Sequence, residues 1–260
     1  MCIEDKYPIL VRNVSKIFGE TVALENVCLQ LKRGEIVGLI GPNGSGKTTL
    51  LKIIMGLVPP CAGEVRVLGR DPLLNPQIRY KMGYVPEEII LYDSLTIREF
   101  LYFIARMRKM DPKKYIEKIK TLVALFEIED KMDDLLGSLS KGDRQKVAII
   151  SALMHSPPIL ILDEPSAGLD PIATIILKRI LFEMKLRGRT ILISTHILEL
   201  AESLCDRIYL LHRGRVIFEG KVTDIRRVGK QLSLEDVFLE MTDVNEKVTK
   251  IRKIIEEVVQ

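Results

Sequence analysis

A glycine-rich segment in the first quarter of the chain has the residue types and spacing to bind a polyphosphate. Residues 41–48 read GPNGSGKT and fit the pattern GxxxxGK[ST]. Glycines let the backbone curl so that successive N–H groups face phosphate oxygens, and the helical stretch at 49–54 adds the partial positive charge of its N-terminus. We expect Lys47 to reach the β- and γ-phosphates of a nucleotide and Thr48 to ligate Mg²⁺. The predicted nucleotide-binding residues of this segment are Gly41, Pro42, Asn43, Gly44, Ser45, Gly46, Lys47, Thr48 and Thr49.

Two acidic residues follow a second apolar segment. Residues 159–162 read ILIL and are followed by Asp163 and Glu164. Neighbouring side chains point to opposite sides of a strand, but at its end both can face a bound nucleotide. Asp163 is then a candidate Mg²⁺ ligand, directly or through water, and Glu164 is free to orient and polarise the attacking water. The alternative is an ordinary strand that ends in a solvated acidic turn.

The elements that would position these residues alternate between short apolar segments and amphipathic helices, which is typical of an α/β fold. Continuous apolar runs at 36–40 and 159–162 are typical of strands buried on both faces of a parallel sheet. The alternating segment 27–31 instead predicts an antiparallel strand with one buried face, so we expect a small antiparallel layer beside the parallel core. The predicted strands are 9–14, 27–31, 35–40, 64–68, 159–162, 190–194 and 207–211.

Residues 94–154 read as consecutive helices and predict a helical subdomain inserted into the α/β core. Thr96 and Glu99 form a capping box ahead of one apolar helix face, and Pro112 begins a second helix. Seven basic residues gather in this stretch, for which a solvated helix face is the first interpretation and proximity to anionic lipid headgroups the second. They are Arg106, Arg108, Lys109, Lys113, Lys114, Lys118 and Lys120.

Composition excludes several classes of protein. The chain has 260 residues, 47% of them hydrophobic and 28% charged, with a net charge of +4. These values fit one or two ordinary globular domains rather than a disordered, collagen-like or rod-like chain, and the charge is too mild to indicate nucleic acid as the main partner. The four cysteines are scattered without metal-ligand spacing, and no apolar run approaches the roughly 18 residues of a membrane helix. The first residues lack an apolar signal core, so a cytoplasmic protein is expected.

Further motifs, in order and in spacing, make the chain resemble the nucleotide-binding subunit of ABC transporters over residues 9 to about 225. Residues 139–145 (LSKGDRQ) stand where that family has its LSGGQ signature, and 166–170 (SAGLD) are similar to its D-loop. Residues 194–196 (STH) resemble its switch-histidine segment, and 84–87 (YVPE) stand at its Q-loop. The resemblance implies a P-loop NTPase (RecA-like) core with an antiparallel β layer and the helical subdomain, all within residues 1–225. Apolar residues at helical spacing between 248 and 258 predict a C-terminal helical extension over 226–260.

Three of the implied site residues would act on a second subunit. Ser140 and Gly142 would meet the γ-phosphate that the opposite subunit binds, and Asp170 would lie at the dimer interface. Local interpretations fit the same residues. Ser140 with Asp143 is a capping-box pattern that opens a helix at 144–154, and Asp170 can cap a helix that begins at Pro171.

Three further residues would complete the site within one subunit. The resemblance implies that His196 contacts the γ-phosphate and the water beside Glu164, that Phe18 stacks on adenine, and that Glu87 joins Thr48 and Asp163 as a metal ligand. A surface histidine and a core aromatic are the local alternatives. Glu87 stands where the family has glutamine, and its carboxylate adds negative charge beside the phosphates.

The resemblance implies an ATP-binding and ATP-hydrolysing subunit of an ABC membrane transporter, with ATP and Mg²⁺ as cofactors. Head-to-tail dimerisation with an identical or a different nucleotide-binding subunit would drive integral membrane permease subunits, and no nucleic acid would bind. The chain would lie in the cytoplasm, peripherally on the inner face of the cell membrane. Residues 86–88 (PEE), 139–142 (LSKG) and 234–239 (LEDVFL) resemble the branch that serves export. A soluble ABC-type ATPase for cluster assembly, repair or translation is the alternative, and a phosphoryl-transfer kinase is the third class.

Overall fold

Two β-sheets of different kind organise the chain, of which this computed structural model describes residues 7–224. A six-stranded sheet has the strand order β5-β6-β7-β3-β8-β9, and a three-stranded sheet has the order β2-β1-β4. The strands are β1 (Ile9–Phe18), β2 (Thr21–Leu31), β3 (Ile36–Ile40), β4 (Ala62–Val67), β5 (Met82–Val85), β6 (Ile159–Asp163), β7 (Thr190–Thr195), β8 (Arg207–His212) and β9 (Arg215–Lys221). The α/β class with an antiparallel layer is therefore confirmed.

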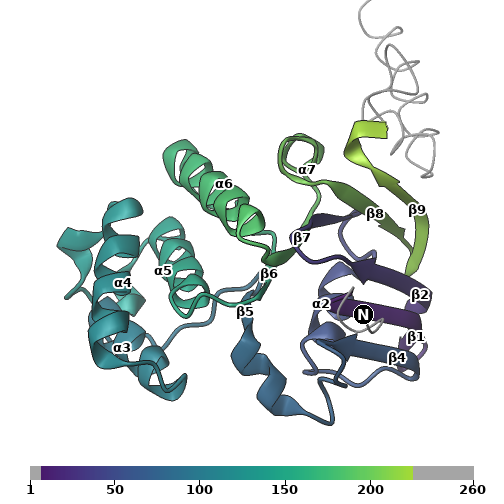
Figure 1. The fold of residues 1–260 in the computed structure, drawn as a ribbon, viewed down its shortest axis with the longest axis horizontal. Coiled ribbons are helices and arrows are strands. Elements are labelled where there is room, and N and C mark those ends of the chain that lie inside the picture. Colours follow the sequence, from purple (N-terminus) through teal and green to yellow (C-terminus); the bar gives the residue numbers. More distant parts are fainter. Residues whose placement is uncertain (1–6, 225–260) are drawn as a thin grey trace, which may run out of the picture.

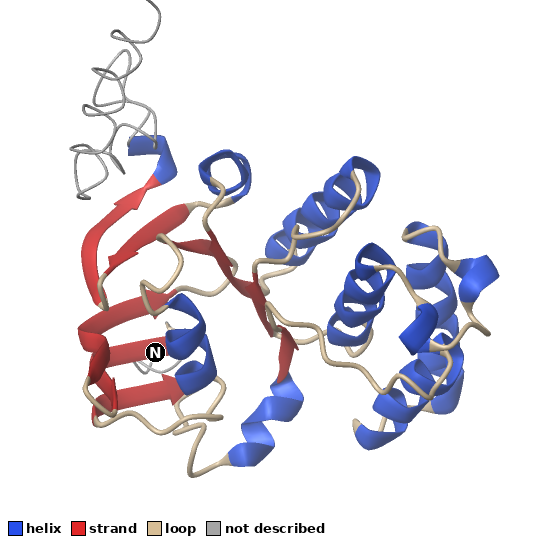
Figure 2. Cartoon of the chain, turned by 180° about the vertical axis from the view of Figure 1, so that it is seen from behind, coloured by secondary structure: helices blue, strands red, loops and turns tan. Residues whose placement is uncertain are grey.

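Helices flank the six-stranded sheet. They are α2 (Lys47–Ile54), α3 (Ile97–Met107), α4 (Pro112–Leu125), α5 (Lys141–Leu153), α6 (Pro171–Leu186) and α7 (Leu198–Leu204), with 3₁₀ turns at Pro76–Lys81, Glu129–Lys131 and Leu136–Ser138. Figures 1 and 2 show α3, α4 and α5 gathered at one end of the molecule and the three-stranded sheet at the other. The Thr96–Glu99 capping box and the helix start at Pro112 are both present as expected.

Parallel pairing brings the chemical segments to one edge of the six-stranded sheet. β3 and β6 both pair in parallel with β7, and Ile40 lies opposite Thr195 while Asp163 lies opposite Ser194. Because the three strands run the same way, their carboxyl ends and the loops that follow them meet there, where α/β sheets bind ligands. This register places the glycine-rich loop, the acidic pair and the histidine segment together.

The central strands β3, β6, β7 and β8 of the six-stranded sheet are buried on both faces, which explains their continuous apolar sequences. Ile36 and Ile40 of β3 pack into the core shared with the helices. Val37 and Leu39, which point the other way, pack into the core shared with α2 and the three-stranded sheet. One short strand thus ties the two cores together and fixes where the glycine-rich loop begins.

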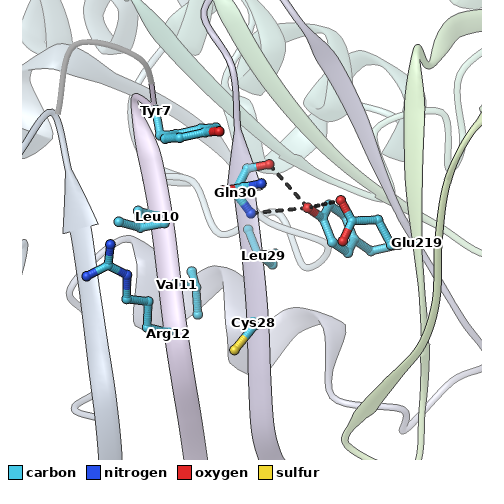
Figure 3. A pocket seen from close by; sticks show the side chains of 9 residues that line it. Tyr7, Leu10, Val11, Arg12, Cys28, Leu29, Gln30 and Glu219 are labelled. Carbon is cyan, nitrogen blue, oxygen red and sulfur yellow. Dashed lines mark hydrogen bonds between the residues drawn. The ribbon is translucent and has the colours of Figure 1, made fainter. Parts of the chain in front are cut away.

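A polar network joins the two sheets at a hollow beside β2 and β9 (Figure 3). The Tyr209 hydroxyl accepts a hydrogen bond from the Gln30 N–H (3.2 Å) and donates one to Glu219 Oε1 (2.9 Å). Arg207 Nε lies 2.9 Å from Glu35 Oε1 and adds a largely buried ion pair. The hollow, of about 290 Å³, is lined by none of the residues that the sequence predicts for chemistry.

Several predicted element boundaries are wrong for identifiable reasons. The first strand continues to Phe18 instead of stopping at 14, and the second begins at Thr21 instead of 27. Asn13 (φ +49°) and Asn26 (φ +50°) sit at irregularities in the β1–β2 ladder, and such bulges break the period of two on which the prediction rests.

Two helices begin earlier than predicted, and two strands were missed. α2 starts at Lys47 rather than 49, and α5 starts at Lys141 rather than 144, because Ser140 itself is the N-cap. β5 is only four residues long, and β9 alternates on an exposed edge, so neither strand has the continuous apolar signature of the central strands. The predicted C-terminal extension over 226–260 lies outside the described residues, and so does Cys2, one of the four cysteines. Within residues 7–224, no helix is both long enough and apolar enough to cross a membrane.

Candidate active site

Two positions in the loop between β3 and α2 can be occupied only by glycine. A side chain there would be strained or would collide with neighbouring backbone. Gly46 has φ +107°, and a Cβ there would lie 2.5 Å from the Ala23 carbonyl oxygen of β2. A Cβ on Gly41 would lie 2.2 Å from the Leu211 carbonyl oxygen of β8. The loop is therefore clamped between the two sheets, and its curl is set before any ligand binds.

Lys47, the first residue of α2, is buried and folded back onto this loop. Its Nζ donates hydrogen bonds to the carbonyl oxygens of Gly41 (2.7 Å) and Pro42 (3.2 Å), and it lies 3.9 Å from Glu164 Oε1. Burial lowers the pKa of the Lys47 ammonium, and the nearby carboxylates, with Glu164 first, oppose that shift. A cation with no close hydrogen-bonded carboxylate in this position is suited to a phosphate.

Asp163 ends β6 in a fully buried position. Its Oδ1 accepts a hydrogen bond from the Ser194 hydroxyl, while its Oδ2 has no hydrogen-bond partner within residues 7–224. Burial raises the pKa of Asp163, against the effect of the Ser194 and Thr48 hydroxyls. The Thr48 hydroxyl donates to Glu87 Oε2 at 3.3 Å, so hydroxyl and carboxylate oxygens gather beside the loop.

These oxygen donors are of the type that Mg²⁺ prefers. Within the described part of the chain, no group of three or more His, Cys, Asp and Glu residues could hold a metal ion by itself. A hydroxyl, a buried carboxylate with an unpartnered oxygen and a second carboxylate do fit a magnesium ion that shares its remaining ligands with phosphates and water.

Glu164 is held in a strained conformation next to His196. Its φ of +48° is in the left-handed region, which residues other than glycine seldom adopt. Its N–H donates to the Ser194 carbonyl oxygen (3.1 Å), which ties the end of β6 to β7. Its buried carboxylate lies 2.9 Å from Nδ1 of the half-exposed His196. Backbone strain of this kind gathers at functional sites, where the surrounding structure enforces it.

The turn that opens α5 packs against the segment before α6. Ser140 caps α5 by accepting a hydrogen bond from the Asp143 N–H (3.1 Å), and it donates its own to Asp143 Oδ2 (2.6 Å). A Cβ on Gly142 would lie 2.7 Å from the Gly168 carbonyl oxygen. Asp143 Oδ2 also pairs with Lys131 at 2.9 Å, so the charge of this carboxylate has a cation beside it.

Asp170 caps α6 as the local interpretation predicts. Its Oδ1 accepts a hydrogen bond from the Ala173 N–H (2.7 Å), and its Oδ2 lies 2.9 Å from Lys146 of α5. The Ala173 hydrogen bond, then the Lys146 contact, lower the pKa of Asp170. The residue therefore links the starts of two helices.

Known proteins match this chain over most of its length. The protein-family model described as ABC transporter matches residues 24–167, more than half of the chain. The chain belongs to the ABC transporter family.

Relatives and solved structures of ABC proteins agree with this assignment. The chain is 36% identical over 217 residues to the Bacillus subtilis "Uncharacterized ABC transporter ATP-binding protein YhaQ", covering 84% of this chain and 72% of that protein. It is 39% identical over 214 residues to the "Nod factor export ATP-binding protein I" of Burkholderia lata, covering 82% and 70%. A solved "ATP binding subunit of ABC transporter" superposes with a TM-score of 0.85 at 37% identity, covering 90% of this chain and 99% of that chain. A "Bacterial ABC Transporter Cassette", MJ0796, solved as a dimer, gives 0.74 at 31% identity, covering 82% and 98%.

As an ABC ATPase, the protein binds ATP and hydrolyses it as the ATP-binding subunit of a transporter. The expected family, the P-loop NTPase fold and the transporter function are thereby confirmed. Relatives of this kind favour the transporter subunit over the soluble ABC-type ATPase and over the kinase.

The structure brings only part of the predicted ABC site together. Hydrogen bonds or ion-pair distances connect the residues at the sheet edge, namely Lys47, Thr48, Glu87, Asp163, Glu164, Ser194 and His196. Within residues 7–224, neither Ser140 nor Asp170 forms a hydrogen bond or an ion pair with the loop 41–48. A cleft of about 670 Å³ lies between Glu87 and the start of α5.

Phe18 stands apart from these groups. It ends β1 with its side chain half exposed, and the Lys16 ammonium lies 4.9 Å from its ring centroid. β2, which pairs with it, passes the glycine-rich loop at Ala23. Stacking of Phe18 on adenine stays a prediction.

Two residues that matter to this site were not singled out from the sequence. Ser194 holds Asp163 and the Glu164 backbone, and only the β6–β7 register reveals the contact. Lys146 pairs with Asp170 from another helix, 24 residues before it in the chain, and no sequence signal points to the pair.

Proposed function

We propose that this ABC ATPase binds ATP with Mg²⁺ at the sheet edge where β3, β6 and β7 end, and drives an exporter as a head-to-tail dimer. The observation that carries the proposal is the meeting of Lys47, Asp163, Glu164 and His196 at that edge. It joins a phosphate-binding cation, a metal-binding carboxylate and a strained carboxylate beside an imidazole.

The loop 41–49 would hold the triphosphate. Its backbone N–H groups and the N-terminus of α2 would face the phosphates, and Lys47 would turn from its own loop carbonyls to the β- and γ-phosphate oxygens. Thr48, Asp163 and Glu87 would hold Mg²⁺, which supplies positive charge to neutralise the phosphate oxygens. The unpartnered Oδ2 of Asp163 supports this assignment.

Glu164 would position the attacking water for in-line displacement of ADP. Its carboxylate accepts a hydrogen bond from the water and takes up the proton as the oxygen bonds to the γ-phosphorus. His196, 2.9 Å from that carboxylate, would keep Glu164 aimed and contact the γ-phosphate through its other edge. Closure of the site excludes bulk water and strengthens these contacts.

The second half of the site would come from another subunit. Ser140 and Gly142 open α5, and a helix N-terminus attracts anions. Their lack of any polar contact with the loop of the same chain supports a γ-phosphate of a partner as their target. In a two-fold, head-to-tail dimer, each subunit would place Ser140 and Gly142 at the γ-phosphate bound by the other, and Asp170 would lie at the interface. The dimeric relative MJ0796 is consistent with this arrangement.

Export rests on sequence likeness. The Burkholderia lata relative is named as a Nod factor export protein, and the chain carries Glu87 and Lys141 in motifs that resemble the export branch. In this proposal the chain sits peripherally on the inner face of the membrane and pushes on permease subunits as the dimer closes.

Paired variants test the catalytic assignment. Glu164→Gln keeps size and burial but cannot accept the proton, so ATP hydrolysis falls by about 100-fold or more while ATP affinity stays within a few-fold. Lys47→Ala abolishes ATP binding. Glu129→Gln, an exposed acid in a 3₁₀ turn, is the matched control and keeps both. The measurements are phosphate release and equilibrium binding of a fluorescent ATP analogue. Hydrolysis by Glu164→Gln at the wild-type rate would contradict the assignment.

A further inference from the structure

A groove of about 740 Å³ lies between α4 and α6, with the end of α5 at its floor. Figures 1 and 2 both show α5 between the α3–α4 pair and α6. Leu122, Leu153, Ile180 and Met184 line the floor and pack against the helical core. Leu125 continues this apolar strip outward, where it is 45% exposed. The volume lies in the range of about 300–1,000 Å³ that small-molecule sites occupy.

Basic side chains outnumber carboxylates in the lining of the same groove. Lys114 and Lys118 come from α4, Arg179 from α6, and Arg187 and Arg189 from the turn before β7. None of the five forms an ion pair with a carboxylate within residues 7–224, although Glu117 and Glu183 line the groove too. Several arginines elsewhere in the described chain do have a close carboxylate partner. Those at 98, 144 and 207 lie 2.8, 2.8 and 2.9 Å from carboxylates.

The charges of Lys118 and Arg189 lie close enough to affect each other. Lys118 donates a hydrogen bond to the Ser156 hydroxyl, and burial together with the charge of Arg189 lowers the pKa of its ammonium. Arg108 lies 2.8 Å from Nε2 of His155, the residue before Ser156 in the sequence, and burial lowers the pKa of this arginine. Like charges that share a partly desolvated site repel each other. A bound anion would relieve that repulsion.

We propose that this groove binds an amphipathic organic anion, with its phosphate or carboxylate head on Lys118, Ser156 and Arg189 and its alkyl chain along the Leu122–Leu125 strip. The head receives charge-assisted hydrogen bonds, which are about twice as strong as neutral ones. The chain covers apolar surface that water now contacts, at about 25 cal/mol per Å². A purely ionic ligand would leave the apolar floor uncovered, and a purely apolar ligand would leave the basic side chains without a counter-charge.

Such a ligand would also bridge two parts of the ATPase. α4 belongs to the helical stretch that carries the signature helix, and α6 begins at Pro171 directly after Asp170. A molecule that contacts both helices favours one relative position of them. ATP turnover is therefore expected to change when the groove fills.

The fluorescent amphipathic anion 11-(dansylamino)undecanoic acid, titrated into the full-length protein below its micelle concentration, tests the site directly. Saturable binding is expected, with competition by dodecyl phosphate but not by inorganic phosphate or the neutral dodecyl maltoside. Loss of two charge-assisted contacts in Lys118→Gln/Arg189→Gln weakens binding by about tenfold or more. The control Lys113→Gln/Lys120→Gln removes the same charge from exposed positions of α4 and leaves affinity unchanged.

A second variant separates the apolar contribution from the charge. Leu125→Ser, at an exposed position that folding tolerates, weakens binding of the long-chain probe several-fold but leaves that of hexanoate unchanged. Circular dichroism and thermal melting confirm that each variant is folded. Equal weakening by both charge variants, no saturable binding, or association only with anionic phospholipid vesicles and not with the monomeric probe would each overturn the proposal.

Discussion

At the scale of residues, two acids of the site have a burial or a backbone conformation that does not stabilise the fold. Asp163 is fully buried with one unpartnered oxygen, and Glu164 carries a left-handed backbone. Both features cost stability, and in our proposal the unpartnered Asp163 oxygen gains a magnesium partner when ATP binds. Sequence reasoning singled out these residues because two acids follow a buried apolar strand in a chain that also carries a phosphate-binding loop. It could not find Ser194, whose role depends on the register between β6 and β7.

Removing the charge of Asp163 is therefore expected to stabilise the free protein. Its folded pKa is raised above the ordinary value, so the native state binds the proton more tightly than the unfolded chain does. The destabilisation is full at neutral pH and fades as pH falls through the raised pKa. Asp163→Asn gains about 1 kcal/mol at pH 7 and progressively less below it.

Thermal unfolding without nucleotide or metal, followed between pH 4 and 8, measures this gain. In the same preparation Asp163→Asn loses magnesium-dependent hydrolysis. A lower melting temperature for Asp163→Asn at neutral pH would show that the carboxylate is stabilising, against our account.

Glu87 places a third negative charge beside the phosphate loop. It accepts the Thr48 hydrogen bond, and removing its charge lowers the repulsion of ATP when no metal is present. Glu87→Gln is expected to bind ATP about two- to fivefold more tightly in EDTA. Glu88→Gln, the exposed neighbour, is the control, and isothermal titration calorimetry reports both affinities. Unchanged or weaker binding by Glu87→Gln would place Glu87 away from the phosphates.

At the scale of elements, helix starts and strand ends position the chemistry. α2, α5 and α6 each begin at a predicted motif, with Ser140 and Asp170 serving as N-caps of the last two. Local patterns predicted a helix start near each motif because capping depends on a few neighbouring residues, although α2 and α5 begin two and three residues before the predicted positions. They did not predict the full length of β1 and β2, since the bulges at Asn13 and Asn26 are set by pairing between strands.

Asp170 allows the contributions of its capping hydrogen bond and of its charge to be separated. Asp170→Ala removes the N-cap of α6 and is expected to lower stability by about 1 kcal/mol. Asp170→Asn keeps the acceptor for the Ala173 N–H and loses only the ion pair with Lys146, in which the Asp170 side chain is half exposed, so it stays close to wild type.

Urea unfolding of the two variants provides the comparison. Because the folded pKa of Asp170 is lowered, its carboxylate stabilises the protein above its ordinary pKa, and this benefit is lost as pH falls through the lowered one. Equal losses in the alanine and asparagine variants would assign the effect to the charge and not to the cap.

At the scale of the whole molecule, the phosphate loop and the start of α5 form no polar contact with each other within residues 7–224. The phosphate loop and its acids lie at the sheet edge, while Ser140 and Gly142 open α5 without a polar contact to that loop. The family resemblance predicts that a second copy closes the gap. Physical arguments from one chain could not predict this second copy. The N-terminus of α5 already has a side-chain cap from its own chain, so nothing local indicates a further ligand.

The state of association of the Glu164→Gln variant tests this central claim most directly. Because hydrolysis is blocked, ATP stays bound and holds the two copies together. Light scattering coupled to gel filtration should give twice the chain mass of 29.5 kDa with ATP and Mg²⁺, and the single mass with ADP. A particle of 29.5 kDa that is saturated with ATP would contradict the account.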